Sequence, residues 1–197
     1  MGDSSDQIYS MAHLRQSIEK NEPLGFLFFW GHTSRDVAQI GKECLSQWYL
    51  RPFLFNGLAF PTAEHWMMYE KARLFQDERI MLSMLDDENP AVAKKLGRQI
   101  RGFDAETWNR EKGRIVFEGN LHKFAQNPEL ADFLFSTGDR VLVEASPDDS
   151  IWGIGLNEQM ARSTAPDQWP GENLLGFALM RVRYALRMKS KKNERGL

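Results

Sequence analysis

The chain has 197 residues, of which 42% are hydrophobic, and its 25 basic and 27 acidic residues give a formal net charge of -2. This length and composition fit one globular domain that buries its core without disulfide bonds, and the near-neutral charge provides no bulk attraction to nucleic acid or anionic membranes. The longest strongly apolar run, residues 24 to 31, is far shorter than the roughly 20 residues of a membrane span.

The N-terminus and the cysteine content indicate the compartment. The first residues lack the basic and then apolar pattern of a secretory signal, and Cys44 is the only cysteine. A lone cysteine fits a reducing compartment, and we interpret it as a small apolar residue rather than a nucleophile. We therefore expect a cytoplasmic protein with a single domain over residues 1–197, a core from about 24 to 188 and a basic flexible tail over 189–197.

Short elements are predicted for the N-terminal part of the chain. Residues 8–20 have the spacing of a short amphipathic helix, and the aromatic run at 25–30 is typical of a buried strand. Asn56 and Gly57 stand between two aromatic-rich runs, which is the pattern of a hairpin with a type I′ turn.

Helical patterns dominate the rest of the sequence. They cover residues 62–75, 76–86, 90–100, 104–125 and 128–136, and prolines mark three of these starts. Residues 140–146 alternate like a short strand, and an amphipathic helix begins near Asn173. The sequence therefore predicts a mainly α fold, α+β at the margin, with a few short strands.

The predicted helix at 62–75 carries two charges on its apolar face. At about 100° per residue, Lys71 lies about 20° from Glu64, within the arc of Met67, Met68 and Phe75. Glu64 either caps the first turn or faces a cleft, and Lys71 either extends past the methionines to water or joins that cleft. In a cleft, burial would raise the pKa of Glu64 and make it a candidate acid or base.

A second cluster follows the predicted strand at 140–146. Glu144 ends this strand, and Asp149 and Trp152 lie in the loop "SPDDSIWGIG". Loops held by rigid elements often carry function, and the glycines around Trp152 would let a ligand approach the indole. The alternative is a tight turn with an Asp cap and a core Trp.

Three further segments offer polar groups. Gln47 and Trp48 in "LSQWYL" suit a planar heterocycle, although a surface loop with one core Trp is the commoner explanation. Asn173 in "WPGENLLG" either contacts substrate or caps the last helix. Arg98 and Lys123 are candidates for phosphate contacts, but such cations on helices are more often solvated.

Several chemistries are excluded by motif. The four histidines show no metal-ligand spacing, and the sequence contains no P-loop, no G-x-G-x-x-G and no G-x-S-x-G. We therefore expect no metal and no cofactor. The sequence sets no expectation for the oligomeric state.

The same clusters, taken in order, resemble the YbiA-like family, also called NADAR domains. The landmarks run from about Phe26 to Arg183 and are "FFWGH", "LSQWY", "TAEHWMMYEKA", "KKLGR", Trp108, "GNLHKF", "TGDRVLVEASPDDSIWGIG" and "GENLLGFALMRVR". The resemblance implies a mainly helical fold and an N-glycosidase, which hydrolyses the C–N bond between ribose and a base-like leaving group. Family substrates are ribosylamino-pyrimidine phosphates of riboflavin synthesis and ADP-ribose attached to guanine in nucleic acid.

The resemblance also implies particular site residues. They are Glu64, Asp149 and Trp152, and in addition Trp48, Lys71, Glu144 and Asn173. Some relatives have an acidic residue at the position of Ile154, so a catalytic carboxylate at that position is excluded in this chain.

One mechanism joins the residue patterns with the resemblance. Breaking a ribosyl C–N bond builds positive charge on the sugar and negative charge on the leaving base, so the reaction needs an anion near the ribose and a proton donor near the base. Two carboxylates in unlike environments can divide these tasks. Glu64 would activate water or stabilise the oxocarbenium-like ribose, and Asp149 would be the complementary acid or orient the substrate, or the two roles would be exchanged.

The other candidates would bind the substrate. Trp48 and Trp152 would stack on the heterocycle, Lys71 would hold a phosphate or tune Glu64, and Asn173 would bond a ribose hydroxyl. The expected partner is a small phosphorylated ribosyl-heterocycle. The alternatives are an ADP-ribosyl-guanine hydrolase acting on nucleic acid and an inert module that binds ADP-ribose-like ligands; the acidic balance of the chain weighs against nucleic acid.

Overall fold

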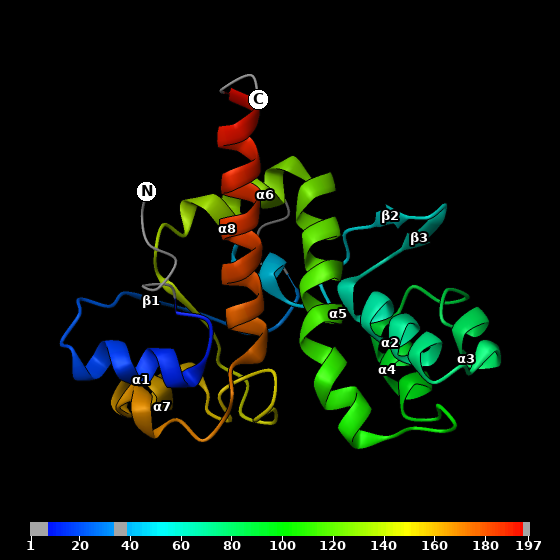
Figure 1. The fold of residues 1–197 in the computed structure, drawn as a ribbon, viewed down its shortest axis with the longest axis horizontal. Helices are drawn as coiled ribbons and strands as arrows, with labels where there is room; N and C mark the ends of the chain where they lie inside the picture. Colours follow the sequence, from blue (N-terminus) through cyan, green and yellow to red (C-terminus); the bar gives the residue numbers. More distant parts are fainter. Residues whose placement is uncertain (1–7, 34–38, 195–197) are drawn as a thin grey trace. The chain divides into compact units, whose positions relative to one another are not determined.

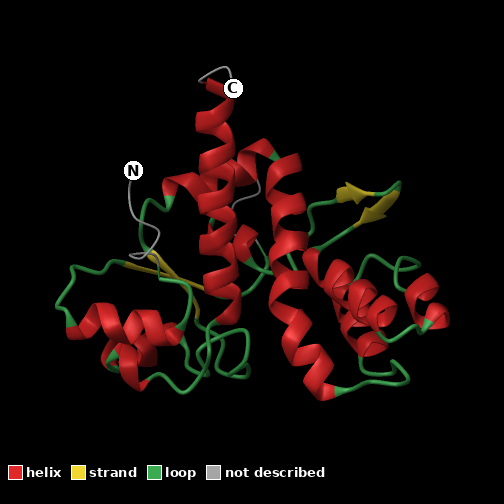
Figure 2. Ribbon diagram, viewed as in Figure 1, coloured by secondary structure: helices red, strands yellow, loops and turns green. Residues whose placement is uncertain are grey.

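A computed structural model describes residues 8–33 and 39–194. The chain forms two compact units, one from Met1–Trp30 with Phe133–Leu197 and the other from Gly31–Asp132. Helices predominate in the described chain, and the strands are few and short (Figure 2). The prediction of a mainly α fold is confirmed, while the single-domain assignment stays a prediction.

The first unit combines helices with a small parallel sheet (Figure 1). Its elements are α1 (Met11–Glu19), β1 (Phe26–Phe29), β4 (Val141–Glu144), α7 (Glu158–Ser163), the 3-10 turn η3 (Pro166–Gln168) and α8 (Leu174–Glu194). The helix α6 (Pro128–Ser136) leads into this unit from the other one. The predicted strands at 25–30 and 140–146 therefore exist and pair with each other.

Strand β4 is central to the first unit. It pairs in parallel with β1, with Phe26 opposite Val141 and Phe29 opposite Glu144. Helix α8 packs on β4, and Gly176 allows this approach, because a Cβ there would meet the carbonyl oxygen of Leu142. The chain after β4 therefore starts from a fixed strand end.

The second unit contains a hairpin and four of the helices. Its elements are the 3-10 turn η2 (Lys42–Leu45), β2 (Phe53–Phe55), β3 (Leu58–Phe60), α2 (Ala63–Leu74), α3 (Glu78–Ser83), α4 (Pro90–Gly97) and α5 (Ala105–Gln126). Asn56 and Gly57 join the two antiparallel strands with φ of 49° and 79°. Both residues at positive φ are the signature of a type I′ turn, so the predicted hairpin is confirmed.

Trp66 lies at the centre of the second unit's core. Its indole is 2% exposed, packs against the edges of Phe55 and Phe60, and donates from Nε1 to the carbonyl of Ile115 at 2.8 Å. Gly119 on α5 is required here, because a Cβ would run into the indole of Trp66. Helix α2 is thus packed directly against α5. This packing fixes the orientation of α2, and with it the positions of the residues on the other faces of α2.

Two helices differ in length from the sequence expectation. The helix expected at 76–86 is only the six residues Glu78–Ser83. Helix α8 continues to Glu194, although a basic flexible tail was expected from residue 189. Lys191 and Lys192 in the last turn favour this extension, because they interact with the negative end of the helix dipole.

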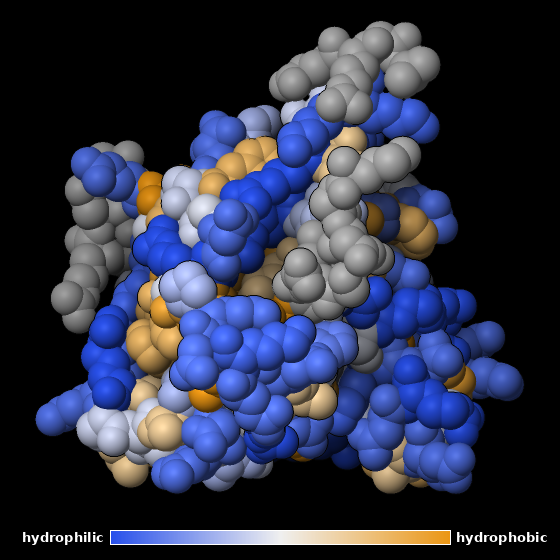
Figure 3. Space-filling view, turned by 60° about the vertical axis from the view of Figure 1, so that its left-hand side comes forward, coloured by the Kyte–Doolittle hydropathy of each residue, from blue (hydrophilic) through white to orange (hydrophobic). Residues whose placement is uncertain are grey.

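One face of the molecule shows hydrophobic residues in small groups among mostly hydrophilic ones (Figure 3). Among the described helices, none has the length and apolar character needed to span a bilayer.

Candidate active site

Glu64 is a buried carboxylate in the first turn of α2. Its residue is 3% exposed, and its backbone N–H donates to the carbonyl of Gln47 at 2.9 Å. The N-cap is Thr62, whose hydroxyl accepts from the N–H of His65. Thr62 therefore provides the N-cap of α2, and Glu64 lies in the first turn as a buried acidic residue.

His65 helps to hold the start of α2 and is itself uncharged. It is fully buried, with Nδ1 2.8 Å from the Thr62 hydroxyl and Nε2 2.8 Å from the carbonyl of Asp87. Because the carbonyl only accepts, Nε2 carries the proton and Nδ1 accepts from Thr62. Burial lowers the pKa of His65, which keeps the ring neutral. The backbone next to Glu64 is thus tied down on both sides.

Lys71 is held against the protein rather than extended to water. Its Nζ donates to the carbonyl of Gly97 at 2.9 Å and lies 4.5 Å from the ring centre of Phe103 and 5.5 Å from that of Trp108. Burial lowers the pKa of Lys71, and the negative charge of Glu64 opposes this shift. Glu64 and Lys71 therefore interact electrostatically along one face of α2, as helical periodicity predicts.

Gln47 and Trp48 follow η2 next to Glu64. The Gln47 side chain is 7% exposed and accepts at Oε1 from Nδ2 of Asn120 at 2.7 Å. Trp48 is partly buried, with its ring centre 5.5 Å from that of His32 and 5.6 Å from Nζ of Lys94. A flat aromatic beside an exposed cation is suited to a heterocycle that carries a phosphate.

The structure corrects the assignment of Lys123 as a phosphate contact. Lys123 is fully buried, and its Nζ donates to the carbonyls of Cys44 and Ser46, both at 2.8 Å. Burial lowers the pKa of Lys123 to about 8, and it raises the pKa of the Cys44 thiol to about 12, so this thiol stays protonated. Lys123 therefore fixes the backbone at Cys44 and Ser46, in the segment that leads to Gln47.

Asn120 is a site-supporting residue that sequence reasoning missed. It is fully buried one turn before Lys123 and donates both to Gln47 and to the carbonyl of Val116. The signal was present in "GNLHKF", where two polar residues three positions apart face the same side of a helix as Val116 and Phe124. Polar residues on a buried helical stripe indicate partners elsewhere in the chain.

Asp149 organises the loop after β4 in the first unit. One oxygen, Oδ1, accepts from the backbone N–H groups of Ile151 at 2.9 Å and Trp152 at 2.8 Å. The expected Asp-capped turn is therefore present, and Trp152 is held by it. The second oxygen, Oδ2, has no hydrogen bond to any residue in the described ranges, so the cap leaves half of this carboxylate for a ligand.

The structure gives Asn173 a different task from the ribose contact expected of it. Asn173 is fully buried at φ 51°. Its Oδ1 accepts from the N–H of Glu144 at 3.0 Å and its Nδ2 donates to the carbonyl of Leu142 at 2.9 Å. The amide thus pairs with β4 as a neighbouring strand would, and it positions Glu144 without being open to a sugar.

The candidates fall into two groups by unit. In the second unit, Gln47, Trp48 and Glu64 lie around the start of α2, and Lys71 lies in the last turn of the same helix. Glu144, Asp149, Trp152 and Asn173 gather around the end of β4 in the first. Arg98 is exposed at the C-terminal end of α4, and its role in phosphate binding stays a prediction.

Comparisons with known proteins give the class. A model of the NADAR domain matches residues 28–187. The chain is 41% identical over 163 residues to N-glycosidase R617 of Acanthamoeba polyphaga mimivirus, covering 80% of this chain and 94% of that protein. It is 31% identical over 136 residues to N-glycosidase YbiA of Shigella flexneri, covering 69% and 76%. The NMR structure of Escherichia coli YbiA matches with a TM-score of 0.67 at 24% identity, over 84% of this chain and 87% of that one, and shows a shared fold.

These relatives carry the name of one enzyme class, hydrolases of N-glycosyl compounds, which is the class predicted from the sequence. The chain belongs to the NADAR domain family.

Proposed function

We propose that this protein is an N-glycosidase that hydrolyses the ribose C–N bond of phosphorylated ribosylamino-pyrimidine intermediates of riboflavin biosynthesis. The observation that carries the proposal is the Glu64 carboxylate, which is 3% exposed in the first turn of α2 and interacts electrostatically with Lys71. The names of the relatives support the reaction class. The choice of substrate rests on the motif resemblance described above.

Glu64 would act at the sugar. A carboxylate in a water-poor environment stabilises developing positive charge on the ribose more strongly than one in bulk water, and it can also take the proton of the attacking water. The backbone around it is fixed by Gln47, Thr62 and His65. A fixed carboxylate needs little reorganisation as charge develops, which is the main source of electrostatic catalysis.

Asp149 would serve the leaving base. Its Oδ1 is used by the turn at Ile151 and Trp152, so the group that protonates or orients the base is Oδ2. Trp152, held by the same turn, would stack on the base from this loop. Glycoside hydrolysis generally employs two carboxylates with separate roles, and the proposal gives Asp149 the role at the leaving base.

The phosphate assignment changes because of the structure. Lys94 replaces Lys123, since Lys94 is exposed and its Nζ lies 5.6 Å from the ring centre of Trp48. Trp48 would stack on the heterocycle while Lys94 and Arg98 on α4 approach the phosphate. Lys71 would tune the charge of Glu64 rather than hold the phosphate, because its Nζ is already bonded to Gly97.

A parallel assay tests the substrate. Purified protein is offered the ribosylamino-pyrimidine phosphate and, separately, an ADP-ribosylated guanine oligonucleotide, and sugar release is followed from each. The proposal expects release of ribose 5-phosphate from the pyrimidine at a kcat/KM at least about tenfold above that for the oligonucleotide. Preference for the oligonucleotide would assign the guanine substrate instead, and binding without turnover of either would indicate a binding module.

Asp149→Asn separates the two roles of Asp149. Asparagine keeps an oxygen that accepts from Ile151 and Trp152, so the turn is retained, but the negative charge and the proton-donating carboxyl are lost. The proposal expects an unchanged melting temperature and a kcat lowered by about a hundredfold or more. A wild-type kcat in Asp149→Asn would show that Asp149 only stabilises the turn and takes no part in the reaction.

A further inference from the structure

The second unit contains a pocket on the side of α2 that faces away from Glu64. Its volume is about 370 Å³, and it is lined by the hairpin β2–β3, by α2 and by α5. At about 100° per residue, Arg73 lies about 180° around α2 from Glu64. The pocket is therefore separate from the residues to which the glycosidase reaction is assigned, and its size is within the range of small-ligand sites.

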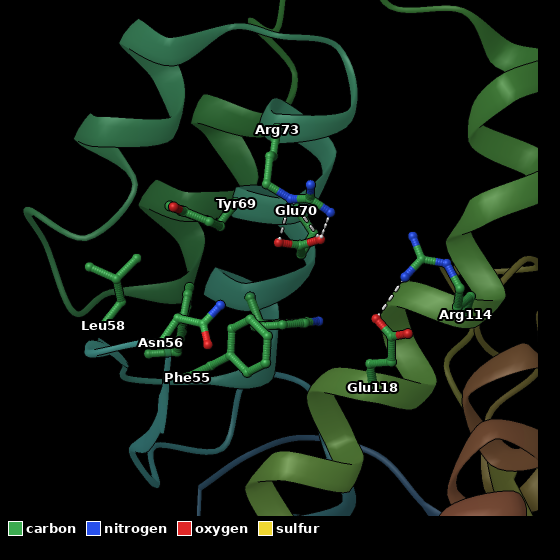
Figure 4. Close-up of a pocket in the computed structure, with 10 residues that line it drawn as sticks. Phe55, Asn56, Leu58, Tyr69, Glu70, Arg73, Arg114 and Glu118 are labelled. Carbon is green, nitrogen blue, oxygen red and sulfur yellow. Dashed lines mark hydrogen bonds and ion pairs between the residues drawn. The ribbon is translucent and has the colours of Figure 1, made fainter.

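Two arginines face each other across this pocket. Figure 4 shows Arg73 with Glu70 on α2 on one side and Arg114 with Glu118 on α5 on the other. The guanidinium of Arg73 makes three hydrogen bonds to Glu70, at 2.7 to 3.1 Å. That of Arg114 donates to Glu111 at 2.9 Å and to Glu118 at 2.8 Å. Both cations are thus held in place before any ligand arrives, which lowers the entropy cost of binding.

Each guanidinium keeps one nitrogen for a ligand. Nη1 of Arg73 and Nη2 of Arg114 make no hydrogen bond within the ranges that the structure describes. The side chains of Arg73 and Arg114 are 57% and 47% exposed. The hydrogen bonds to Glu70 raise the pKa of Arg73, and the positive charge of Arg114 opposes this shift. A small anion between the two free nitrogens would relieve this repulsion and complete both hydrogen-bonding patterns.

The charge of the lining limits the ligand to one anionic group. Glu70 and Glu118 balance Arg73 and Arg114, so a chain of phosphates would meet carboxylates as well as cations. The two oxygens of Glu118 are not equally used, because only Oε2 binds Arg114. Glu118 Oε1 can therefore accept from a hydroxyl or amino group of the same ligand.

The hairpin supplies a surface for a flat ring. Phe55 is partly exposed, with its ring 5.0 Å from Trp66 and perpendicular to it at 88°. Tyr69 is fixed against Phe60 at 5.2 Å. The side chain of Asn56 lies at the hairpin end of the same pocket (Figure 4). Rigid aromatic faces beside a hydrogen-bonding amide are typical of sites that take a planar heterocycle.

We propose that this pocket is a second ligand site, which binds a planar heterocycle carrying a single phosphate or carboxylate. The ring lies on Phe55 and Tyr69 and the anionic group bridges Arg73 and Arg114. Ligands with this chemistry are nucleoside monophosphates and heteroaromatic carboxylates. The site does not depend on the glycosidase proposal.

Amide chemical shifts of the ¹⁵N-labelled full chain test the site. The probes are uridine 5′-monophosphate, orotate and uridine, which offer a ring with a phosphate, a ring with a carboxylate and an uncharged ring with ribose. We expect saturable shifts of Asn56, Gly57 and Arg114 with at least one of the two anions, and a Kd at least tenfold weaker for uridine. Whichever anion binds more tightly identifies the anionic group that the site prefers.

Three variants locate the binding. Arg114→Gln should weaken binding of the anion at least tenfold, whereas Arg110→Gln on the same helix, where Arg110 pairs with Glu106 outside the pocket, should leave it within twofold. Glu64→Gln should also bind within twofold of the wild type, whatever its effect on turnover. The proposal is overturned by no shift at the hairpin with either anion, or by shifts that survive Arg114→Gln and disappear in Glu64→Gln.

Discussion

Replacing Lys123 by Met tests the buried ammonium beneath the candidate active site. Lys123 is fully buried and its Nζ binds the carbonyls of Cys44 and Ser46. Burial lowers its pKa from 10.5 to about 8. At about 1.36 kcal/mol per pH unit, this lowering corresponds to roughly 3 kcal/mol by which the buried charge destabilises the folded protein.

The pH dependence follows from the direction of this shift. The unfolded chain binds the Lys123 proton more tightly than the folded protein, so this group makes the unfolding free energy rise with pH between the folded pKa of about 8 and the unfolded value of 10.5. Below this pH window the buried charge destabilises the folded protein in full, and above it this destabilisation is absent. From about pH 7 to about pH 10 the unfolding free energy of the wild type should rise by roughly 2 to 3 kcal/mol relative to that of Lys123→Met.

Urea unfolding followed by tryptophan fluorescence measures the effect. The quantity of interest is the difference in unfolding free energy between wild type and Lys123→Met at several pH values, because other titrating groups cancel in it. The control is Lys112→Met, which removes a partly exposed lysine from the same helix. A Lys123→Met difference that stays constant within about 0.5 kcal/mol across this range would refute a buried ammonium at this position.

Two further substitutions test the packing that positions the site. Asn173→Ala removes both side-chain hydrogen bonds to β4 and should lower the unfolding free energy by about 2 to 3 kcal/mol. The control Asn157→Ala loses one capping hydrogen bond and should lower it by about 1 kcal/mol. Equal losses in the two variants would contradict the pairing of Asn173 with β4. Gly119→Ala should cost about 1 to 3 kcal/mol by pushing on Trp66. Gly113→Ala on the same helix, where the added methyl meets open space, should be neutral or stabilising, so a neutral Gly119→Ala would contradict the close helix packing.

Local sequence signals predicted the elements well. The Asn56-Gly57 turn, the prolines that begin α4 and α6 and the apolar alternation of β4 depend on residues that are neighbours in the chain. Those elements therefore appear where the sequence places them. The last turns of α8 were not predicted, because propensity gives little signal where a basic helix continues without apolar residues.

Roles that depend on distant partners were not predictable. The sequence shows a lysine at position 123 on a helix, and such residues are usually solvated, but its partners are carbonyls 77 and 79 residues earlier. Asn173 similarly pairs with backbone groups about 30 residues away, at Leu142 and Glu144. In both cases the sequence identified the polar residue, but only the folded structure shows which backbone groups lie next to it.

Glu64 shows what periodicity and resemblance each contribute. Periodicity alone placed Glu64 and Lys71 on one face and left a cap, a solvated lysine and a cleft as alternatives. In the structure Thr62 is the N-cap of α2, Glu64 is an acidic residue of the first turn, and the Lys71 ammonium binds the carbonyl of Gly97. The catalytic role of Glu64 stays a proposal, which rests on the resemblance and on the burial of its carboxylate.

The most direct test of this account is the single-turnover rate of Glu64→Gln with the ribosylamino-pyrimidine phosphate. Glutamine keeps the size of the side chain and removes its charge, and the exposed Glu88→Gln serves as control. With an unchanged circular dichroism spectrum, Glu64→Gln should release ribose 5-phosphate at least about a hundredfold more slowly than wild type, and Glu88→Gln at the wild-type rate. A folded Glu64→Gln that reacts within about twofold of the wild-type rate would contradict the central role of this carboxylate.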